Sequence, residues 1–297
     1  MSTPKAITVD LGGTHIRCAT VDYQGNISQL QKEKSEIHKG YKYVINKMIS
    51  MIRKQTAFDE VNLIGIGCPG PLSAKKGVVY APPNLSDWDQ VPLTAIIQKE
   101  VNKQVCLEND ANVAALGEAT FGSGRGYQIC QYITISTGVG GGIVINGKLV
   151  SGQHNCAGEV GNIIIRDNGS EVKALNKGSF EGEASGRSLM IRANRAGLSV
   201  HDAEAVFTLY QEGSPAAMRV VQDYAHDIAR GMATIAQVID PDVFILGGGV
   251  MNAFAILEPL ILKYYPSYVY PVMGEVQIKQ ASLEEPGIVG AAFLANN

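Results

Sequence analysis

Two glycine-rich segments of the sequence contain residue types that can bind phosphate. The first, Asp10-Leu11-Gly12-Gly13-Thr14, follows an apolar stretch. Adjacent glycines let the backbone turn tightly and approach a ligand, exposing N–H groups and the Thr14 hydroxyl to phosphate oxygens. An ordinary hairpin with a Gly-Gly turn has the same pattern. Asp10, at the end of the apolar stretch, is suited to orienting a hydrated Mg²⁺.

The second segment, residues 136–142 with Thr137 and Gly138, repeats this plan 126 positions later, counted from Ile7 to Ile133. A third glycine run, Gly247-Gly248-Gly249, follows another apolar stretch. A unit that recurs once at this interval suggests two similar α/β halves with a cleft between them. One phosphate-binding hairpin from each half would suit a nucleoside triphosphate, so the segments together favour phosphate transfer.

Other nucleotide-binding motifs do not fit these glycines. In the dinucleotide pattern the last glycine would be Ile143 after the second segment, or Asn252 after the third. Residues 142–148 imitate a P-loop, but Leu149 stands where the Mg²⁺-binding Ser or Thr is required. We therefore do not expect an NAD enzyme or a Walker-type ATPase.

The motif Glu108-Asn109-Asp110 lies where a short apolar strand gives way to a helix of small residues. In the first turn, Asp110 would be favoured as a carboxylate by the helix dipole and could accept a proton from a substrate hydroxyl. Phosphoryl transfer needs such an aligned group more than it needs a strong base. The alternative is that Asn109 or Asp110 only caps the helix; the glycine hairpins favour catalysis.

Two further carboxylates, Glu159 and Glu181, lie in glycine- and alanine-rich surroundings. An ionised carboxylate offers two acceptor oxygens and can bind several sugar hydroxyls. The alternative is that both are exposed surface acids. Trp88 either forms a stacking wall for a sugar or covers the edge of the core. His154 and Cys156 alone are too few ligands for a closed metal site.

An α/β protein with two lobes should position these groups. The expected strands, recognised as short apolar runs, are 6–9, 16–21, 62–68, 105–107, 132–135, 143–145 and 243–246. The expected helices are 41–54, 111–119, 218–239 and 287–294. The helix at 218–239 is amphipathic, with Asp227 among the polar residues opposite its apolar face. We expect a small lobe of residues 1–117 plus about 284–297, and a large lobe of residues 118–283.

Composition restricts the class of protein further. Of 297 residues, 45% are hydrophobic and 18% charged, which indicates a folded globular protein. The net charge of −3 provides no basic field for nucleic acid or anionic lipid. No apolar run approaches a membrane span and no secretory leader precedes the first strand, so we expect a cytoplasmic protein. The five widely spaced cysteines suit reduced core thiols.

In combination and order, these motifs resemble the ROK family of sugar kinases and sugar-responsive repressors over essentially the whole chain. The resemblance implies a two-lobed actin-like ATPase (ribonuclease H-like) fold with the active site in the interlobe cleft, and ATP with Mg²⁺ as cofactors. It implies that Asp110 is the catalytic base. The implied sugar-binding residues are Asn84, Asn109, Asp110, Glu159, Asn162 and Glu181. The implied ATP-binding residues are Asp10, Gly12, Gly13, Thr14, Arg17, Thr137, Gly138, Gly248 and Gly249.

The sequence departs from the family pattern at two places. Asn162 stands where the family has a histidine that serves both sugar and zinc, and Ser179 stands where a cysteine of the zinc loop is expected. We therefore expect no structural zinc, and the sugar is open: glucose, N-acetylmannosamine, fructose or a β-glucoside.

The resemblance implies a homodimer that phosphorylates a small-molecule sugar, with the 6-hydroxyl of a hexose as the expected acceptor. The alternative is a non-catalytic sugar sensor. Repressors similar to this family carry an added N-terminal helix-turn-helix, whereas here the first hairpin begins within ten residues of Met1. The expectation is therefore an enzyme that binds neither nucleic acid nor membrane.

Overall fold

The computed structural model describes residues 3–82, 85, 87–172 and 174–296, which form two units. The first unit comprises Met1–Gln128, Gly142–Ala157 and Ser282–Asn297, and the second comprises Ile129–Gly141 and Gly158–Ala281. Compared with the lobes expected from the sequence, residues 118–128 and 142–157 group with the first unit. The predicted sugar-binding residue Asn84 lies outside the described residues.

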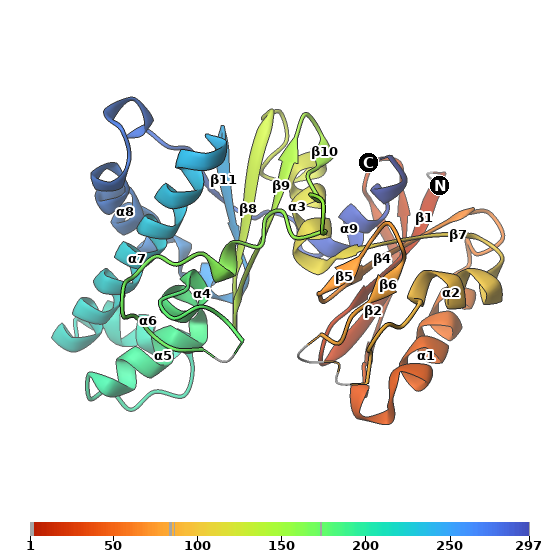
Figure 1. Ribbon diagram of the computed structural model, residues 1–297, viewed down its shortest axis with the longest axis horizontal. Helices are drawn as coiled ribbons and strands as arrows, with labels where there is room; N and C mark the ends of the chain where they lie inside the picture. The colour runs from red at the N-terminus through yellow and green to blue at the C-terminus, as the bar shows by residue number, and fades with distance from the viewer. Residues whose placement is uncertain (1–2, 83–84, 86, 173, 297) are drawn as a thin grey trace. The chain divides into compact units, whose positions relative to one another are not determined.

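The first unit contains a five-stranded sheet with helices on both faces (Figure 1). Its strands, in the order β3-β2-β1-β4-β7, are Ile27–Lys34, His15–Asp22, Pro4–Leu11, Leu63–Cys68 and Gln104–Asn109. Its helices are α1 (Tyr41–Arg53), α2 (Leu93–Val101), α3 (Asp110–Phe121) and α9 (Pro286–Ala291), with short elements β5 (Leu72–Ser73), β6 (Val78–Val79), η1 (Ile37–Lys39) and η6 (Leu294–Asn296). The hairpin predicted at the N-terminus is confirmed as β1 paired antiparallel with β2.

The alternation of side chains along β1 decides which residues face which helices. Ile7, Val9 and Leu11 pack into the core beneath α1 and α2, whereas Ala6 packs with Ile288 of α9 on the opposite face. Asp10 shares the face of Ala6, since side chains of a strand alternate. The fold therefore directs the Asp10 carboxylate toward α9, away from the apolar core.

The second unit contains the turn of the second glycine hairpin, residues 136–138. Its sheet has the order β10-β9-β8-β11-β12, with strands Lys148–Leu149, Val139–Ile145, Ile129–Ile135, Val243–Gly247 and Ile278–Gln280. Residues from Gly142 onward in β9, with β10, group with the first unit. The helices are α4 (Phe180–Ala184), α5 (Gly186–Arg195), α6 (Ala203–Gln211), α7 (Pro215–Ile239) and α8 (Phe254–Tyr264), with η2 (Val160–Asn162), η3 (Gly249–Ala253), η4 (Tyr265–Tyr268) and η5 (Pro271–Met273).

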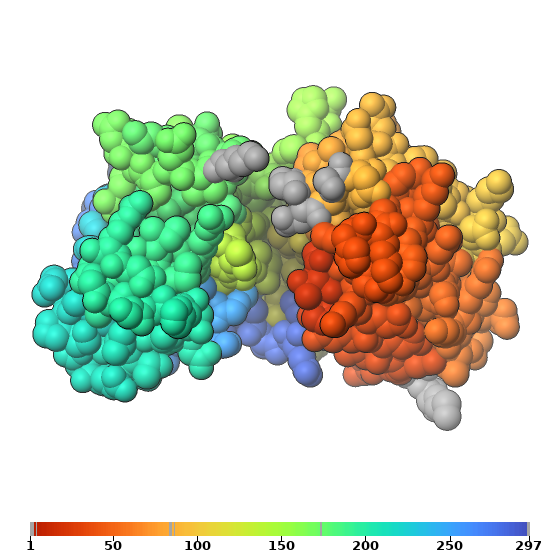
Figure 2. Space-filling model, turned by 90° about the horizontal axis from the view of Figure 1, so that it is seen from below, coloured from red at the N-terminus to blue at the C-terminus, as the bar shows by residue number. Residues whose placement is uncertain are grey.

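Helix α7 organises the core of this unit. Figure 1 shows α7 and α8 side by side, and Figure 2 shows α5 and α6, in blue-green, forming much of the visible surface of the unit. Tyr224, Ile228 and Met232 are fully buried on α7, as its apolar spacing predicts. Asp227 was expected on the exposed face, which is wrong: its side chain is 0% exposed because two arginines from other segments cover it.

None of the five cysteines, all of which are among the described residues, forms a disulfide, and Cys18, Cys68 and Cys130 are buried as expected. Cys156 is exposed, unlike the core thiols that the sequence suggested. Among the helices that the structure describes, none combines the length and apolar character needed to cross a bilayer.

Candidate active site

Asp10, the last residue but one of β1, belongs to a group of three interacting charged side chains. The Arg17 Nη1 donates to Asp10 Oδ2 over 3.0 Å, and the Arg17 Nε lies 3.2 Å from Glu285 Oε1. Burial raises the pKa of Asp10, and the Arg17 guanidinium opposes this rise. Burial also raises the pKa of Glu285. Glu285 was not predicted from the sequence, because only the fold brings it to Arg17.

The turn between β1 and β2 is closed by its own backbone. The Gly12 N–H donates to the His15 carbonyl over 2.9 Å, so this N–H serves the turn. Ser35 holds the tip of the turn, donating its Oγ to the Gly13 carbonyl over 2.8 Å and its N–H to the Thr14 carbonyl over 2.9 Å. Gly13 and Thr14 are exposed and remain the parts of this turn that can approach a phosphate.

The junction of β7 and α3 assigns separate roles to Asn109 and Asp110. Asn109 is the N-cap, and its Oδ1 accepts from the N–H groups of Ala111 (2.9 Å) and Asn112 (3.3 Å). Asp110 is the first helical residue and accepts from the Ala111 N–H over 2.8 Å. The capping alternative is therefore fulfilled by Asn109, and the Asp110 carboxylate is not needed for it.

The carboxylates of Asp10 and Asp110 belong to one corner of the first unit. Strand β4 lies between β1 and β7, and Gly67 pairs with Asp10 on one side and Glu108 on the other. A Cβ atom on Gly67 would lie 3.8 Å from both Asp10 Oδ1 and Asp110 Cα. Burial raises the pKa of Asp110; the Ala111 N–H opposes this, and the charge of Asp10 adds to it.

Glu108 stabilises this corner through hydrogen bonds to three side chains, and it was not predicted as a site residue. Its side chain is buried, and its Oε1 accepts from Asn112 Nδ2 (3.1 Å) and Asn155 Nδ2 (2.6 Å). The Ser151 Oγ donates to Glu108 Oε2 over 3.1 Å. A glutamate directly before the Asn-Asp pair was the available sequence signal, but Ser151 and Asn155 follow β10 and are brought to it only by the fold.

In the second unit, Glu181 is bound to the second glycine hairpin. Its Oε2 accepts from the Val139 N–H over 2.9 Å. A Cβ atom on Gly138 would lie 2.5 Å from the same oxygen, so a side chain at this position would displace Glu181. A predicted sugar-binding carboxylate and a predicted phosphate-binding glycine are therefore in direct contact.

Glu159 and Asn162 lie at the two ends of the short helix η2, and both are exposed. The Asn162 Oδ1 accepts from the Asn176 N–H over 2.7 Å, and Asn176 Nδ2 donates to the Asn162 carbonyl over 3.2 Å. Asn162 is thus tied to the segment that precedes α4. Ser179 is buried and caps α4, its Oγ accepting from the Gly182 N–H over 3.2 Å.

A pocket of about 790 Å³ lies wholly within the second unit. It is lined by Ser136 and Thr137 of the glycine hairpin and by residues of α5, α6, η3 and the start of α8, including Arg187, Phe207, Gly249 and Asn252. This volume suits a small-molecule ligand of nucleoside size. Of the predicted ATP-binding residues, Thr137 and Gly249 line this pocket, and Gly248, with φ of 86°, turns the chain into η3.

Trp88 is 0% exposed and packs its ring edge-on to Tyr41, with centroids 6.4 Å apart, so it covers the core. No group of three or more His, Cys, Asp or Glu that could hold a metal ion occurs among residues 3–82, 85, 87–172 and 174–296.

The described residues that the sequence predicted for the site are divided between the two units. Asp10, Gly12, Gly13, Thr14, Arg17, Asn109 and Asp110 lie in the first unit, and Thr137, Gly138, Glu159, Asn162, Glu181, Gly248 and Gly249 in the second.

Known proteins match this chain over nearly its whole length. Residues 6–297 match the ROK family. A glucokinase from Thermotoga maritima is 31% identical over 98% of this chain and 96% of its own length. The crystal structure of a ROK hexokinase from Thermus thermophilus has a TM-score of 0.87 at 31% identity, covering 97% of each chain. A ROK family glucokinase from Streptomyces griseus, solved with glucose and AMPPNP, has a TM-score of 0.81 at 30% identity, covering 97% of this chain and 98% of its own.

Proposed function

Because the chain belongs to the ROK family, we propose that it is an ATP-dependent hexose kinase in which Asp110 takes the proton from the attacking sugar hydroxyl. The observation that carries this proposal is the place of Asp110 beside Asp10 at the end of the parallel strands. The raised pKa of Asp110 brings its basicity closer to neutral pH, where a general base is most effective. The expected acceptor is the 6-hydroxyl of a hexose such as glucose.

Asn109 and Glu108 support this base without reacting themselves. The Asn109 Oδ1 caps α3 while its amide group remains for a sugar hydroxyl, and Glu108 joins the strand end to Asn155 and Ser151. Since phosphoryl transfer depends on alignment of the attacking oxygen, a rigid β7–α3 junction favours the reaction. Glu181, Glu159 and Asn162 are the sugar-binding groups that the second unit would supply.

The nucleotide would bind in the pocket of the second unit, with Thr137, Gly138 and Gly249 near its phosphates. Asp10 is the residue that would hold Mg²⁺, since carboxylate oxygens are the ligands this ion prefers and one or two suffice when phosphates supply the rest. When bound, Mg²⁺ neutralises charge on the transferring phosphoryl group. Arg17 opposes the rise that burial causes in the pKa of Asp10, and its hydrogen bond orients the carboxylate for this role.

The test is a coupled ADP-release assay with Mg²⁺-ATP and a panel of glucose, mannose, fructose, N-acetylmannosamine, N-acetylglucosamine and cellobiose. We expect turnover on at least one sugar, and its loss in Asp110→Asn while sugar still binds. Asp89→Asn is the matched control, because Asp89 is exposed and is not among the assigned site residues. Sugar binding without any turnover would instead support a sensor, and normal activity of Asp110→Asn would contradict the assigned base.

By the same family resemblance, we propose that the enzyme is a homodimer. Light scattering should return twice the mass of one chain, and the mass of a single chain would contradict this.

A further inference from the structure

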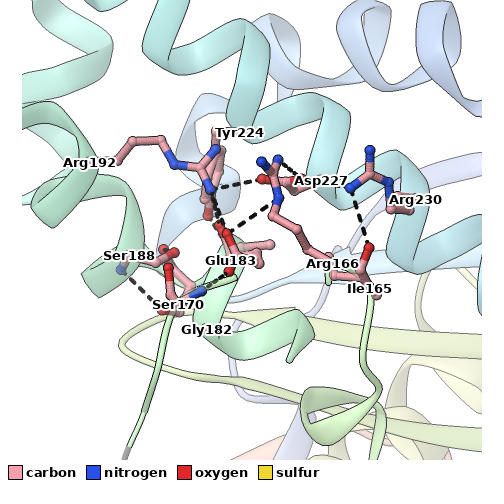
Figure 3. Close-up of polar contacts among 12 residues, drawn as sticks. Ile165, Arg166, Ser170, Gly182, Glu183, Ser188, Arg192, Tyr224, Asp227 and Arg230 are labelled. Atoms are coloured by element: carbon pink, nitrogen blue, oxygen red, sulfur yellow. Dashed lines mark hydrogen bonds and ion pairs between the residues drawn. The ribbon is translucent and has the colours of Figure 1, made fainter. Parts of the chain in front are cut away.

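Five charged residues of the second unit form a connected cluster (Figure 3). The ion-pair cluster consists of Arg166, Glu183, Arg192, Asp227 and Arg230. Arg166 Nη2 donates to Asp227 Oδ1 over 2.5 Å, and Arg192 Nη2 donates to Asp227 Oδ2 over 2.8 Å. Glu183 Oε2 lies 3.2 Å from Arg192 Nη2 and 3.7 Å from Arg166 Nε. The two carboxylates thus share the two arginines.

Both carboxylates of the ion-pair cluster are buried, with side-chain exposures of 0% for Asp227 and 4% for Glu183. Burial of a charge is costly unless the charge is paired and hydrogen-bonded. Replacing a buried ion pair with apolar residues of similar volume often leaves a protein as stable as before. Overall stability is therefore a weak explanation for these residues. Their geometry, which ties together three separate segments of the chain, gives a stronger one.

The segment held by the ion-pair cluster is residues 163–179, which we call the strap and describe apart from residue 173. Arg166 ties the start of the strap to α7, and the Ser170 N–H donates to Glu183 Oε1 on α4. The Ile165 N–H donates to the Gly178 carbonyl over 2.9 Å, which closes the strap on itself. Gly178 has φ of 72°, and a Cβ atom there would collide with the Arg166 carbonyl. The strap is therefore fixed at the position of Arg166.

Asn162 and Glu181, two of the three sugar-binding groups assigned to the second unit, flank the strap. Asn162 directly precedes it and is hydrogen-bonded to Asn176 within it. Glu181 follows it in the first turn of α4, and the neighbouring Phe180 N–H donates to the Ile163 carbonyl over 2.7 Å. A shift of the strap would move both groups, whereas the walls of the nucleotide pocket include no strap residue.

We propose that the ion-pair cluster positions Asn162 and Glu181 for the sugar, with Arg166 and Asp227 as positioning residues that do not touch the substrate. The inference rests on the proposed function. A misplacement of about 1 Å far from the reacting atoms can lower the rate by about 100-fold. Loss of the Arg166–Asp227 pair should also misplace groups that hydrogen-bond the sugar, which weakens sugar binding by about tenfold or more, while ATP binding changes little.

The experiment compares Arg166→Gln and Asp227→Asn with the unmodified enzyme in three measurements: KM for sugar, KM for ATP, and hydrogen exchange of peptides covering residues 163–184. We expect a rise of the sugar KM, a change of less than about twofold in the ATP KM, and faster exchange in the strap. The double variant should be no worse than the poorer single one, since groups that act as a unit are not additive. Arg166→Lys should recover part of the sugar affinity.

Ile235→Ala is the control for a general loss of stability. Ile235 is buried on the same helix, eight residues and about 12 Å from Asp227 along its axis. Unchanged strap exchange in Arg166→Gln, an unchanged sugar KM despite faster exchange, or equal effects in Ile235→Ala would each overturn the proposal. If the unmodified protein turns over no sugar, the proposed function fails by itself, and the exchange measurement with direct sugar titration decides the positioning role.

Discussion

Asn155 and Glu108, 47 residues apart, are joined by a 2.6 Å hydrogen bond from Nδ2 to Oε1. The Asn155 Oδ1 also accepts from the Ala74 N–H over 3.1 Å, so one amide links the loop after β10 to both β7 and the loop after β5. Because Glu108 immediately precedes Asn109 and Asp110, this link fixes the end of the strand that leads into Asp110, the proposed base.

Asn155→Ala should therefore reduce both stability and turnover. Glu108 would lose a partner while remaining buried, which typically costs about 1–3 kcal/mol. Urea unfolding measures the first effect and kcat the second. Asn46→Ala, on the exposed face of α1, should change the free energy of unfolding by no more than about 0.5 kcal/mol. Normal kcat in Asn155→Ala would show that this link does not position the base.

Asp110→Asn should lower kcat by about 100- to 10,000-fold, the usual contribution of a general base, while raising stability at pH 7. The pKa of Asp110 in the fold is raised above its ordinary value of 3.8, mainly by burial. Folding therefore disfavours its charge above the unfolded pKa, and this penalty is absent at lower pH, where both states are protonated. The asparagine removes the penalty.

Thermal unfolding of Asp110→Asn and the unmodified enzyme at pH 7 and near pH 3 measures this difference. The gain should be present at pH 7 and disappear at the acidic pH. Asp89→Asn, at an exposed site, should show no comparable gain. A loss of stability at pH 7 in Asp110→Asn would contradict the raised pKa.

Gly138→Ala should weaken the binding of both sugar and ATP. The Cβ atom of the alanine would lie 2.5 Å from Glu181 Oε2 and displace the carboxylate from the Val139 N–H. Inserting a methyl group into such a contact typically costs about 1–3 kcal/mol. We expect higher KM values for sugar and ATP in steady-state kinetics. Adding Glu181→Asp, which shortens the side chain, should restore stability without restoring sugar affinity; an unaffected single variant would exclude this contact from the site.

Ser179→Ala should destabilise the start of α4 by about 0.5–2 kcal/mol, the usual cost of losing an N-cap. The buried Ser179 Oγ accepts from the Gly182 N–H, and Glu181 lies between them in the same turn. Hydrogen exchange should accelerate around residues 179–184 together with a rise in the sugar KM. Ser214→Ala, which removes the cap of α7 at the Ala217 N–H, should leave the exchange of α4 unchanged.

Local sequence patterns were enough to predict the elements that depend on neighbouring residues. Apolar runs ending in glycine predicted both hairpins, and the polar triplet at 108–110 predicted the strand-to-helix junction that carries Asp110. These features were predictable because strand period, turn chemistry and helix capping act over a few neighbouring residues.

Tertiary structure alone decided which polar groups meet. Asp227 looked like a residue of an exposed helix face, yet Arg166 and Arg192 bury it from 61 and 35 residues away. The contacts Glu108–Asn155 and Arg17–Glu285 likewise join distant segments. A helix pattern records which side of the helix is apolar, but not which other segment will cover the polar side. For a buried charge, that covering partner decides whether the residue can be accommodated at all.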